Sequence, residues 1–87
     1  MKTIYKYPIN DDPIIIPNDS KIRHVGLDPQ GVVCVWVELN TNSECKNMNL
    51  QFKITGTGQR MSEDWENYAS SILQGAFMWH IYYRKIV

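Results

Sequence analysis

The sequence predicts a mostly β domain, a small barrel or sandwich of about six strands. Short segments rich in Val, Ile, Tyr, Trp and Thr lie between chain breakers along all 87 residues. These residue types suit a pleated, half-buried surface better than a helix. Several segments also alternate in polarity with the period of two that a strand requires. The breakers are Pro8, Pro13, Pro17, Gly26, the turn at 28–31, the polar run at 40–49, Gly56, Gly58 and Gly75.

The first half of the chain contains one strong strand and several shorter ones. "KTIYKY" at 2–7 is a short candidate strand, and "IIIP" at 14–17 can form only an edge piece because prolines flank it. "DPQG" at 28–31 has the residue preferences of a type I turn, so we expect 21–27 and 32–39 to form a hairpin. "VVCVWVEL" at 32–39 is mostly apolar on both faces, which predicts a central strand.

The second half contains two further strands with clear alternation. In "LQFKIT" at 50–55, apolar and polar residues alternate, which predicts one buried and one solvated face. "FMWHIYYR" at 77–84 is expected to be a long C-terminal strand with a second, aromatic face. Gln74 and Gly75 could turn the chain between 68–73 and 76–84.

One segment is a candidate for a short helix near residues 62–70. Ser62 is a suitable N-cap, and Glu63 and Asp64 would lie at the positive end of the helix dipole. There is no internal repeat and no linker, so residues 1–87 are expected to form a single domain.

Composition and charge exclude several classes of function. Nine Lys/Arg balance nine Asp/Glu, so there is no net positive field to draw the chain onto nucleic acid. No apolar run has the length of a signal peptide or of a membrane span, so we expect a cytoplasmic protein that contacts no membrane. Cys34 and Cys45 are therefore expected to be free thiols.

The glycine-rich stretch "KITGTGQR" is the one candidate site for a small ligand. Successive backbone N–H groups can bind an anion, and flanking basic side chains would supply charge. The spacing matches neither a phosphate loop nor a dinucleotide-binding motif, so the favoured interpretation is that the two glycines permit positive φ where a strand bends. The candidate ligand residues are Lys53, Gly56, Thr57, Gly58 and Arg60.

No pattern indicates an enzyme. The two histidines and two cysteines lack the short spacing of a structural metal site, and no nucleophile, base and orienting partner can be recognised. We expect no catalytic residues, no metal and no cofactor.

Aromatic and charged residues offer a better candidate, a protein-binding surface. Trp36, Trp65, Trp79, Tyr82 and Tyr83 are many large rings for so short a chain, and exposed rings anchor interfaces. An acidic trio surrounds Trp65, for which a solvated loop is the favoured interpretation over a partner-binding tip. The candidate interaction residues are Glu63, Asp64, Trp65, Glu66, His80, Tyr82 and Arg84.

The order of four segments resembles a small family of unknown function that is common in phage and prophage genomes. The segments are "MKTIYKYPI", "IPNDSKIRHVGLDPQGVVCVWVEL", "FKITGTGQRM" and "GAFMWHIYY". Members of that family usually carry His-Pro after the glycines, where this chain has Gln59 and Arg60. The resemblance implies a phage or prophage product that acts in the bacterial cytoplasm, and it assigns no catalytic residue.

These observations lead to three hypotheses. The first is a phage-encoded interaction protein that binds and inhibits a host protein, such as a component of a bacterial defence system. The second is a module that sequesters a small ligand or nucleotide at the Gly56–Gly58 turn. The third is a structural subunit that forms homo-oligomers through an open sheet edge, for which the C-terminal strand is the candidate.

Overall fold

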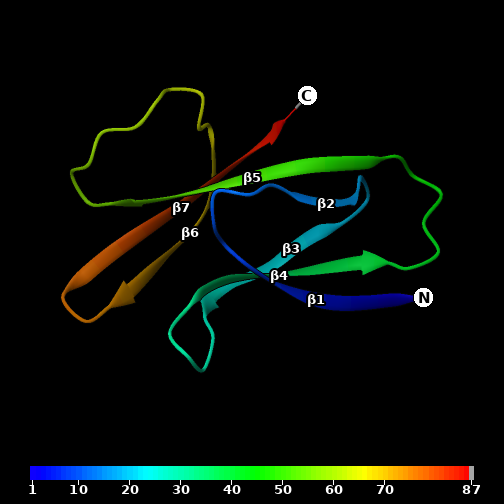
Figure 1. Cartoon of the computed structure of the whole chain (residues 1–87), viewed down its shortest axis with the longest axis horizontal. Helices are drawn as coiled ribbons and strands as arrows, with labels where there is room; N and C mark the ends of the chain where they lie inside the picture. Colours follow the sequence, from blue (N-terminus) through cyan, green and yellow to red (C-terminus); the bar gives the residue numbers. More distant parts are fainter. Residues whose placement is uncertain (87) are drawn as a thin grey trace.

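The protein is a β sandwich of two antiparallel sheets (Figure 1). A computed structural model describes residues 1–86, which contain no helix. One sheet has the strand order β1-β4-β3 and the other β2-β5-β7-β6. The predicted β fold is confirmed as a sandwich. Its strands are β1 (Lys2–Pro8), β2 (Ile14–Pro17), β3 (Lys21–Leu27), β4 (Val33–Asn40), β5 (Asn47–Gly56), β6 (Asn67–Gln74) and β7 (Phe77–Ile86).

The core lies between the two sheets and is built by the predicted alternation. Val35, Val37 and Leu39 of β4 face inward and are buried, as are Leu50 and Phe52 of β5. The strand β4 lies between β1 and β3, so its predicted central position is confirmed. Burying such side chains stabilises a fold by about 1.5–3 kcal/mol each.

The β3–β4 hairpin closes through the turn that the sequence predicts. The Gly31 N–H donates to the Asp28 carbonyl at 2.9 Å, and Gly31 has a φ of 79° that an L side chain rarely adopts. The Asp28 carboxylate accepts hydrogen bonds from the N–H groups of Gln30 and Val32 at 2.9 and 3.0 Å. Lys6 of β1 lies 3.4 Å from the same carboxylate. The hydrogen bond from Val32 is the main reason that the pKa of Asp28 lies below its usual value, with smaller contributions from Gln30 and Lys6.

The lowered pKa of Asp28 makes the stability of the turn depend on pH. A depressed carboxyl pKa in the folded state stabilises the fold above the unfolded pKa, and this contribution is lost as pH falls through the folded pKa. We expect Asp28→Asn to melt at a lower temperature than wild type at pH 7. The difference should shrink as the pH is lowered from 7 to 3, since the unfolded chain binds a proton at this carboxyl more readily than the folded chain does. Thermal melting at both pH values tests this, and an equal difference at both would contradict it.

Residues 62–66 are irregular and the chain is extended from Asn67 onward, so the predicted helix near 62–70 is wrong. Ser62 does accept a hydrogen bond from the Asp64 N–H at 3.3 Å, but only one turn follows, closed by the Trp65 N–H on the Ser62 carbonyl. From Asn67 onward the chain pairs with β7 instead. A helix of this length is marginal without tertiary packing. Pairing with β7 satisfies more of the backbone N–H and C=O groups of this segment.

The C-terminal strand is not at a sheet edge. The strand β7 lies between β5 and β6, so its assignment as the open edge is wrong. The edges of the four-stranded sheet are β2 and β6. The predicted hairpin before β7 is confirmed, although Gln74 ends β6 and the turn residues are Gly75, with a φ of 61°, and Ala76.

The two cysteines are unpaired, as expected. Cys34 is buried and Cys45 is exposed. Burial is the main cause that raises the pKa of the Cys34 thiol. Residues 1–86 form no helix long and apolar enough to cross a membrane.

Candidate functional site

The Gly-Thr-Gly stretch forms a tight turn at the end of β5. The Gln59 N–H donates to the Gly56 carbonyl at 3.1 Å, and Gly58 has a φ of 83°, as the third residue of a type II turn requires. Positive φ is therefore confirmed at Gly58 and wrong at Gly56, which ends the strand opposite Trp79. The Gly56 N–H donates to the Gln59 side-chain oxygen at 2.8 Å. The Gly56 N–H is thus already bound to the Gln59 side chain and is not free to donate to an anion.

The turn is held against the sheet by a chain of hydrogen bonds through His80. The His80 Nε2 lies 3.0 Å from the Thr57 hydroxyl, and its Nδ1 lies 2.9 Å from the Tyr68 hydroxyl. Thr57 also donates to the Met78 carbonyl at 3.5 Å. A consistent assignment therefore runs from the Tyr68 O–H to Nδ1, from the Nε2–H to Thr57, and from Thr57 to Met78. In this arrangement the imidazole does not accept the Thr57 proton, so it does not activate Thr57 as a nucleophile. The hydrogen bonds instead hold the glycine turn against the sheet, and we call them the clamp.

The clamp predicts the effect of removing one hydroxyl. Thr57→Val leaves the His80 Nε2 without its partner, so we expect the free energy of unfolding to fall by about 0.5–1.5 kcal/mol. Urea denaturation measures the loss. Ser71→Ala is the matched control, because Ser71 pairs with His80 from the neighbouring strand β6 and takes no part in these hydrogen bonds. Equal stability of the two variants would contradict the clamp.

A second set of contacts pins the loop between β5 and β6 to the same sheet face. The Arg84 guanidinium stacks on the Trp65 ring at 4.1 Å and donates to the Gln51 side chain at 3.1 and 3.0 Å. It also lies 3.6 Å from the Asp64 carboxylate. Trp65 and Arg84 are both half-buried, whereas Glu63 and Glu66 are exposed. All three acidic residues are exposed, and Asp64 is the one that also contacts Arg84.

Two hollows flank the glycine turn. One, of about 210 Å³, lies on the outer sheet face and is lined by the turn together with Met61, His80 and Tyr82. The other, of about 380 Å³, lies between the turn and residues 76–79 at the start of β7. Neither is lined by a lysine or an arginine. Lys53 lines a separate, smaller hollow, and Arg60 lines neither that hollow nor the two beside the turn. The structure therefore brings Gly56, Thr57 and Gly58 to His80 and Tyr82, but does not bring the two predicted cations to them.

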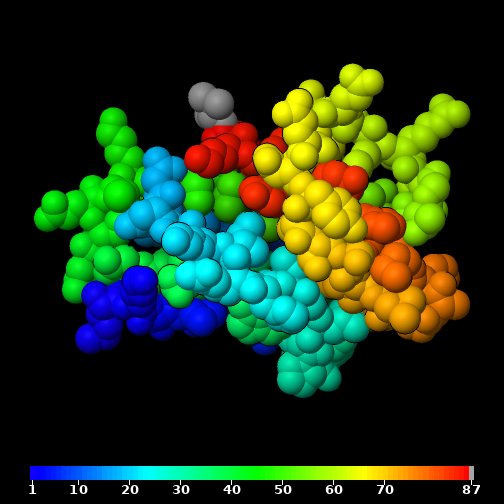
Figure 2. All heavy atoms as spheres, turned by 180° about the vertical axis from the view of Figure 1, so that it is seen from behind, coloured from blue at the N-terminus to red at the C-terminus, as the bar shows by residue number. Residues whose placement is uncertain are grey.

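The end of the β6–β7 hairpin carries exposed apolar side chains. Leu73 and Phe77 expose 66% and 65% of their surface, and Met78 exposes 39%. We call these three residues the hairpin patch. Leu73 and Met78 are cross-strand neighbours on the outer face of the hairpin, whereas Phe77 lies on the other face, where it stacks on Trp79 with ring centroids 5.7 Å apart. Figure 2 shows the orange end of the hairpin at a corner of the molecule. The patch lies beside the larger hollow, because Phe77 and Met78 also line it.

A chain of side-chain contacts keeps the hairpin end in place. The Trp79 indole N–H donates to the Gln74 side-chain oxygen at 3.1 Å. Gln74 in turn donates to the Gly31 carbonyl at 3.4 Å, in the β3–β4 turn of the other sheet. The apolar side chains are therefore presented on a supported hairpin, which lowers the ordering cost of binding.

The sequence reasoning missed the hairpin patch. The five rings it selected, Trp36, Trp65, Trp79, Tyr82 and Tyr83, are all half-buried, and the exposed rings near the site belong to Tyr68 and Phe77. A usable signal was present, because Leu73, Phe77 and Met78 immediately flank the Gln74–Gly75 turn.

The fold and this surface define a small two-sheet β domain with an apolar hairpin patch beside a clamped glycine turn. Among residues 1–86, no group of three or more His, Cys, Asp or Glu is placed to hold a metal ion. The chain belongs to the family described as "Domain of unknown function (DUF7352)", whose model matches residues 1–86. No curated protein and no solved structure matches the chain. The expectation of a family of unknown function that covers nearly the whole chain is confirmed.

Proposed function

We propose that the protein is a non-enzymatic interaction protein that binds a protein partner through the hairpin patch. The observation that carries the proposal is the exposure of Leu73, Phe77 and Met78 on a supported hairpin. Aromatic residues and Met are enriched in protein interfaces, and apolar side chains gathered on a small domain mark such sites. The adjoining hollow of about 380 Å³ can receive an apolar side chain of the partner.

The source of the partner follows from the resemblance of the sequence to phage and prophage proteins. We propose that the protein is phage-encoded, that it acts in the bacterial cytoplasm, and that its partner is a host protein. Binding would inhibit that protein, and a component of a bacterial defence system is the target class we favour. The expected interface is apolar at its centre, with Tyr68, His80 and Tyr82 at its polar rim.

Nucleotide sequestration at the glycine turn has less support. An anion there would meet no lining lysine or arginine, and the Gly56 N–H already donates to Gln59. Charge and free donors are what hold a phosphate at such a turn. Protein binding therefore remains the leading proposal.

The test is capture from host lysate with three versions of the chain. We expect wild type and Ile15→Ser to retain the same host protein, and Leu73→Ser/Phe77→Ser to lose it. Ile15 is the matched control because it is 67% exposed on β2, at the other edge of the same sheet. Capture of the same proteins by all three versions, or of none, would contradict the proposal. So would a wild-type dimer that the double variant abolishes, because the patch would then bind a second copy.

A further inference from the structure

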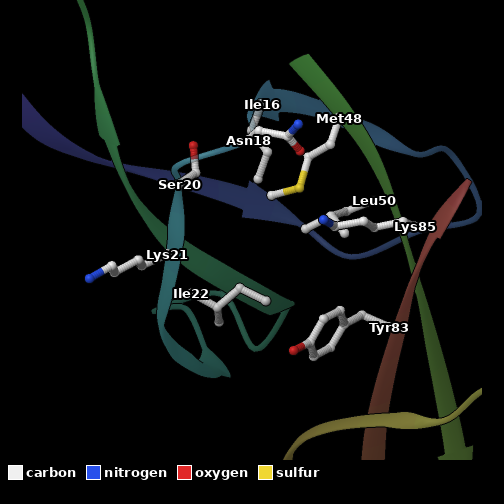
Figure 3. Close-up of a pocket in the computed structure, with 9 residues that line it drawn as sticks. All are labelled: Ile16, Asn18, Ser20, Lys21, Ile22, Met48, Leu50, Tyr83 and Lys85. Atoms are coloured by element: carbon white, nitrogen blue, oxygen red, sulfur yellow. The ribbon is translucent and has the colours of Figure 1, made fainter. Parts of the chain in front are cut away.

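A pocket between the two sheets, at the other end of β7 from the hairpin patch, has the features of a separate ligand site. It has a volume of about 380 Å³ and opens beside the connection between β2 and β3 (Figure 3). This size is at the lower end of the roughly 300–1,000 Å³ range of ligand pockets. We call it the inter-sheet pocket.

The pocket exists because the two sheets are unequally covered at this end. The strand β6 begins at Asn67, opposite Tyr83, so the last residues of β7 have only β5 as a neighbour. The chain crosses between the sheets at residues 18–20, where the Asn18 N–H donates to the Lys46 carbonyl at 2.9 Å. Within residues 1–86, no strand therefore closes the gap between the start of β3 and the end of β7.

The floor of the pocket is apolar. Ile16 and Leu50 are 1% and 2% exposed and belong to the core, and Ile22 and Met48 pack beside them. An apolar portion of a ligand placed here would gain roughly 0.8 kcal/mol per buried CH₂ group. The floor alone would accept any small apolar group, so specificity must come from the rim.

The rim carries a lysine where the strand pattern expects an apolar residue. Ile81, Tyr83 and Lys85 share the inward face of β7, and Lys85 lies opposite the buried Leu50. Figure 3 shows the Lys85 side chain extending from β7 into the space between the labelled residues, whereas Lys21 points away from it. The ion pairs of residues 1–86 do not include Lys85. Lys85 thus supplies a positive charge next to an apolar floor.

Further polar groups are present at the same rim, and no acidic residue lines the pocket. Tyr83 presents a hydroxyl on the β3 side of the pocket (Figure 3). The Ser20 hydroxyl is buried and has no hydrogen-bond partner within the described chain. Figure 3 shows this hydroxyl pointing away from Lys85 and Tyr83, so the Tyr83 hydroxyl is the hydrogen-bond donor that a ligand in the pocket can reach.

We infer that the inter-sheet pocket binds a small amphipathic anion, a carboxylate or phosphate headgroup on a short alkyl or acyl chain. The headgroup pairs with Lys85 and accepts a hydrogen bond from the Tyr83 hydroxyl. The tail lies along Ile16, Ile22 and Leu50. This site is distinct from the hairpin patch, so its occupancy can be tested without the protein partner.

The test is titration of the full chain with octanoate, octyl phosphate and octanol, followed by backbone amide NMR. We expect at least one of the two anions to shift the amide signals of Ser20, Leu50 and Lys85, and to bind more tightly than octanol. The preferred headgroup then tells whether a fatty acid or a phosphate ester is the ligand class. No shift from either anion, or equal binding of octanol, would overturn the inference.

Two variants test how much the Lys85 charge contributes to binding of the anion. Lys85→Met keeps the length of the side chain and should weaken binding of the anion about tenfold or more, since a charge-assisted hydrogen bond is lost. Lys53→Met makes the same change on β5, outside this pocket, and should leave binding unchanged. If Lys85→Met does not fold, Lys85→Gln replaces it. Equal affinities of the Lys85 and Lys53 variants would overturn the assignment of the headgroup.

Discussion

Ile81→Ala should lower the free energy of unfolding by about 3–4 kcal/mol, because it removes a fully buried side chain from the central strand of the larger sheet. Ile81 is 0% exposed and lies opposite Ile54 of β5 and Ser70 of β6. A domain of this length is stable by only roughly 4–13 kcal/mol. The variant is therefore expected to be close to unfolding at 37 °C.

Urea denaturation followed by tryptophan fluorescence measures this loss. Ile4→Ala is the control, because Ile4 is 54% exposed on β1, and it should change stability by less than about 0.5 kcal/mol. Ile81→Val should give an intermediate loss of about 1 kcal/mol. A loss below 1 kcal/mol for Ile81→Ala would contradict the position of Ile81 between the sheets.

Leu73→Ser/Phe77→Ser should have the opposite profile, with binding lost and the fold retained. Both side chains are about two-thirds exposed, so the folded chain gains little from them; the stacking of Phe77 on Trp79 limits the cost to about 1 kcal/mol. A partner that binds around the hairpin tip would bury both side chains, which project from opposite faces of the hairpin. Removing two such anchors should lower the affinity for the partner about 100-fold or more.

The affinity of each variant for the captured partner is measured by calorimetry. Ile15→Ser should bind as wild type does, although it removes a similar exposed side chain. If the double variant binds within threefold of wild type, the hairpin patch is not the interface. If it unfolds instead, Leu73→Ser and Phe77→Ser are tested singly against the same partner.

Much of the fold follows from local pattern. The period of two in β5 is strong because a residue that broke it would place a polar side chain in the core, and the unbroken apolar run of β4 predicts a central strand. Asp28 and Gly31 specify the β3–β4 turn by a side-chain acceptor and a positive φ, which are both local properties. These elements could therefore be predicted without tertiary information.

The errors arise where tertiary contacts decide between local alternatives. Residues from 67 onward could start a helix or a strand, and pairing with β7 selects the strand. The contact between Thr57 and His80 joins residues 23 apart, so no local pattern reveals it. The order of strands in the sheet, which places β7 in the centre, is also a property of the whole chain.

The site could be predicted only in part, because tertiary contacts decide which of its residues lie together. Gly56, Thr57, Gly58, His80 and Tyr82 were selected on separate grounds, and the structure places them around one hollow. Leu73 and Met78 are exposed because they face away from the other sheet, which alternation can predict. The exposure of Phe77 cannot be derived from alternation, because Phe77 has the same inward parity as the buried Ile81.

The most direct test of the proposed function is photo-crosslinking in host cells with a photoreactive phenylalanine analogue at position 77, and in parallel at position 15. The account predicts one discrete adduct from position 77, with the mass of one copy of this chain plus one host protein, and no such adduct from position 15. The same adducts from both positions, or none from position 77, would contradict binding through the hairpin patch. An adduct with twice the mass of this chain would show instead that the patch binds a second copy.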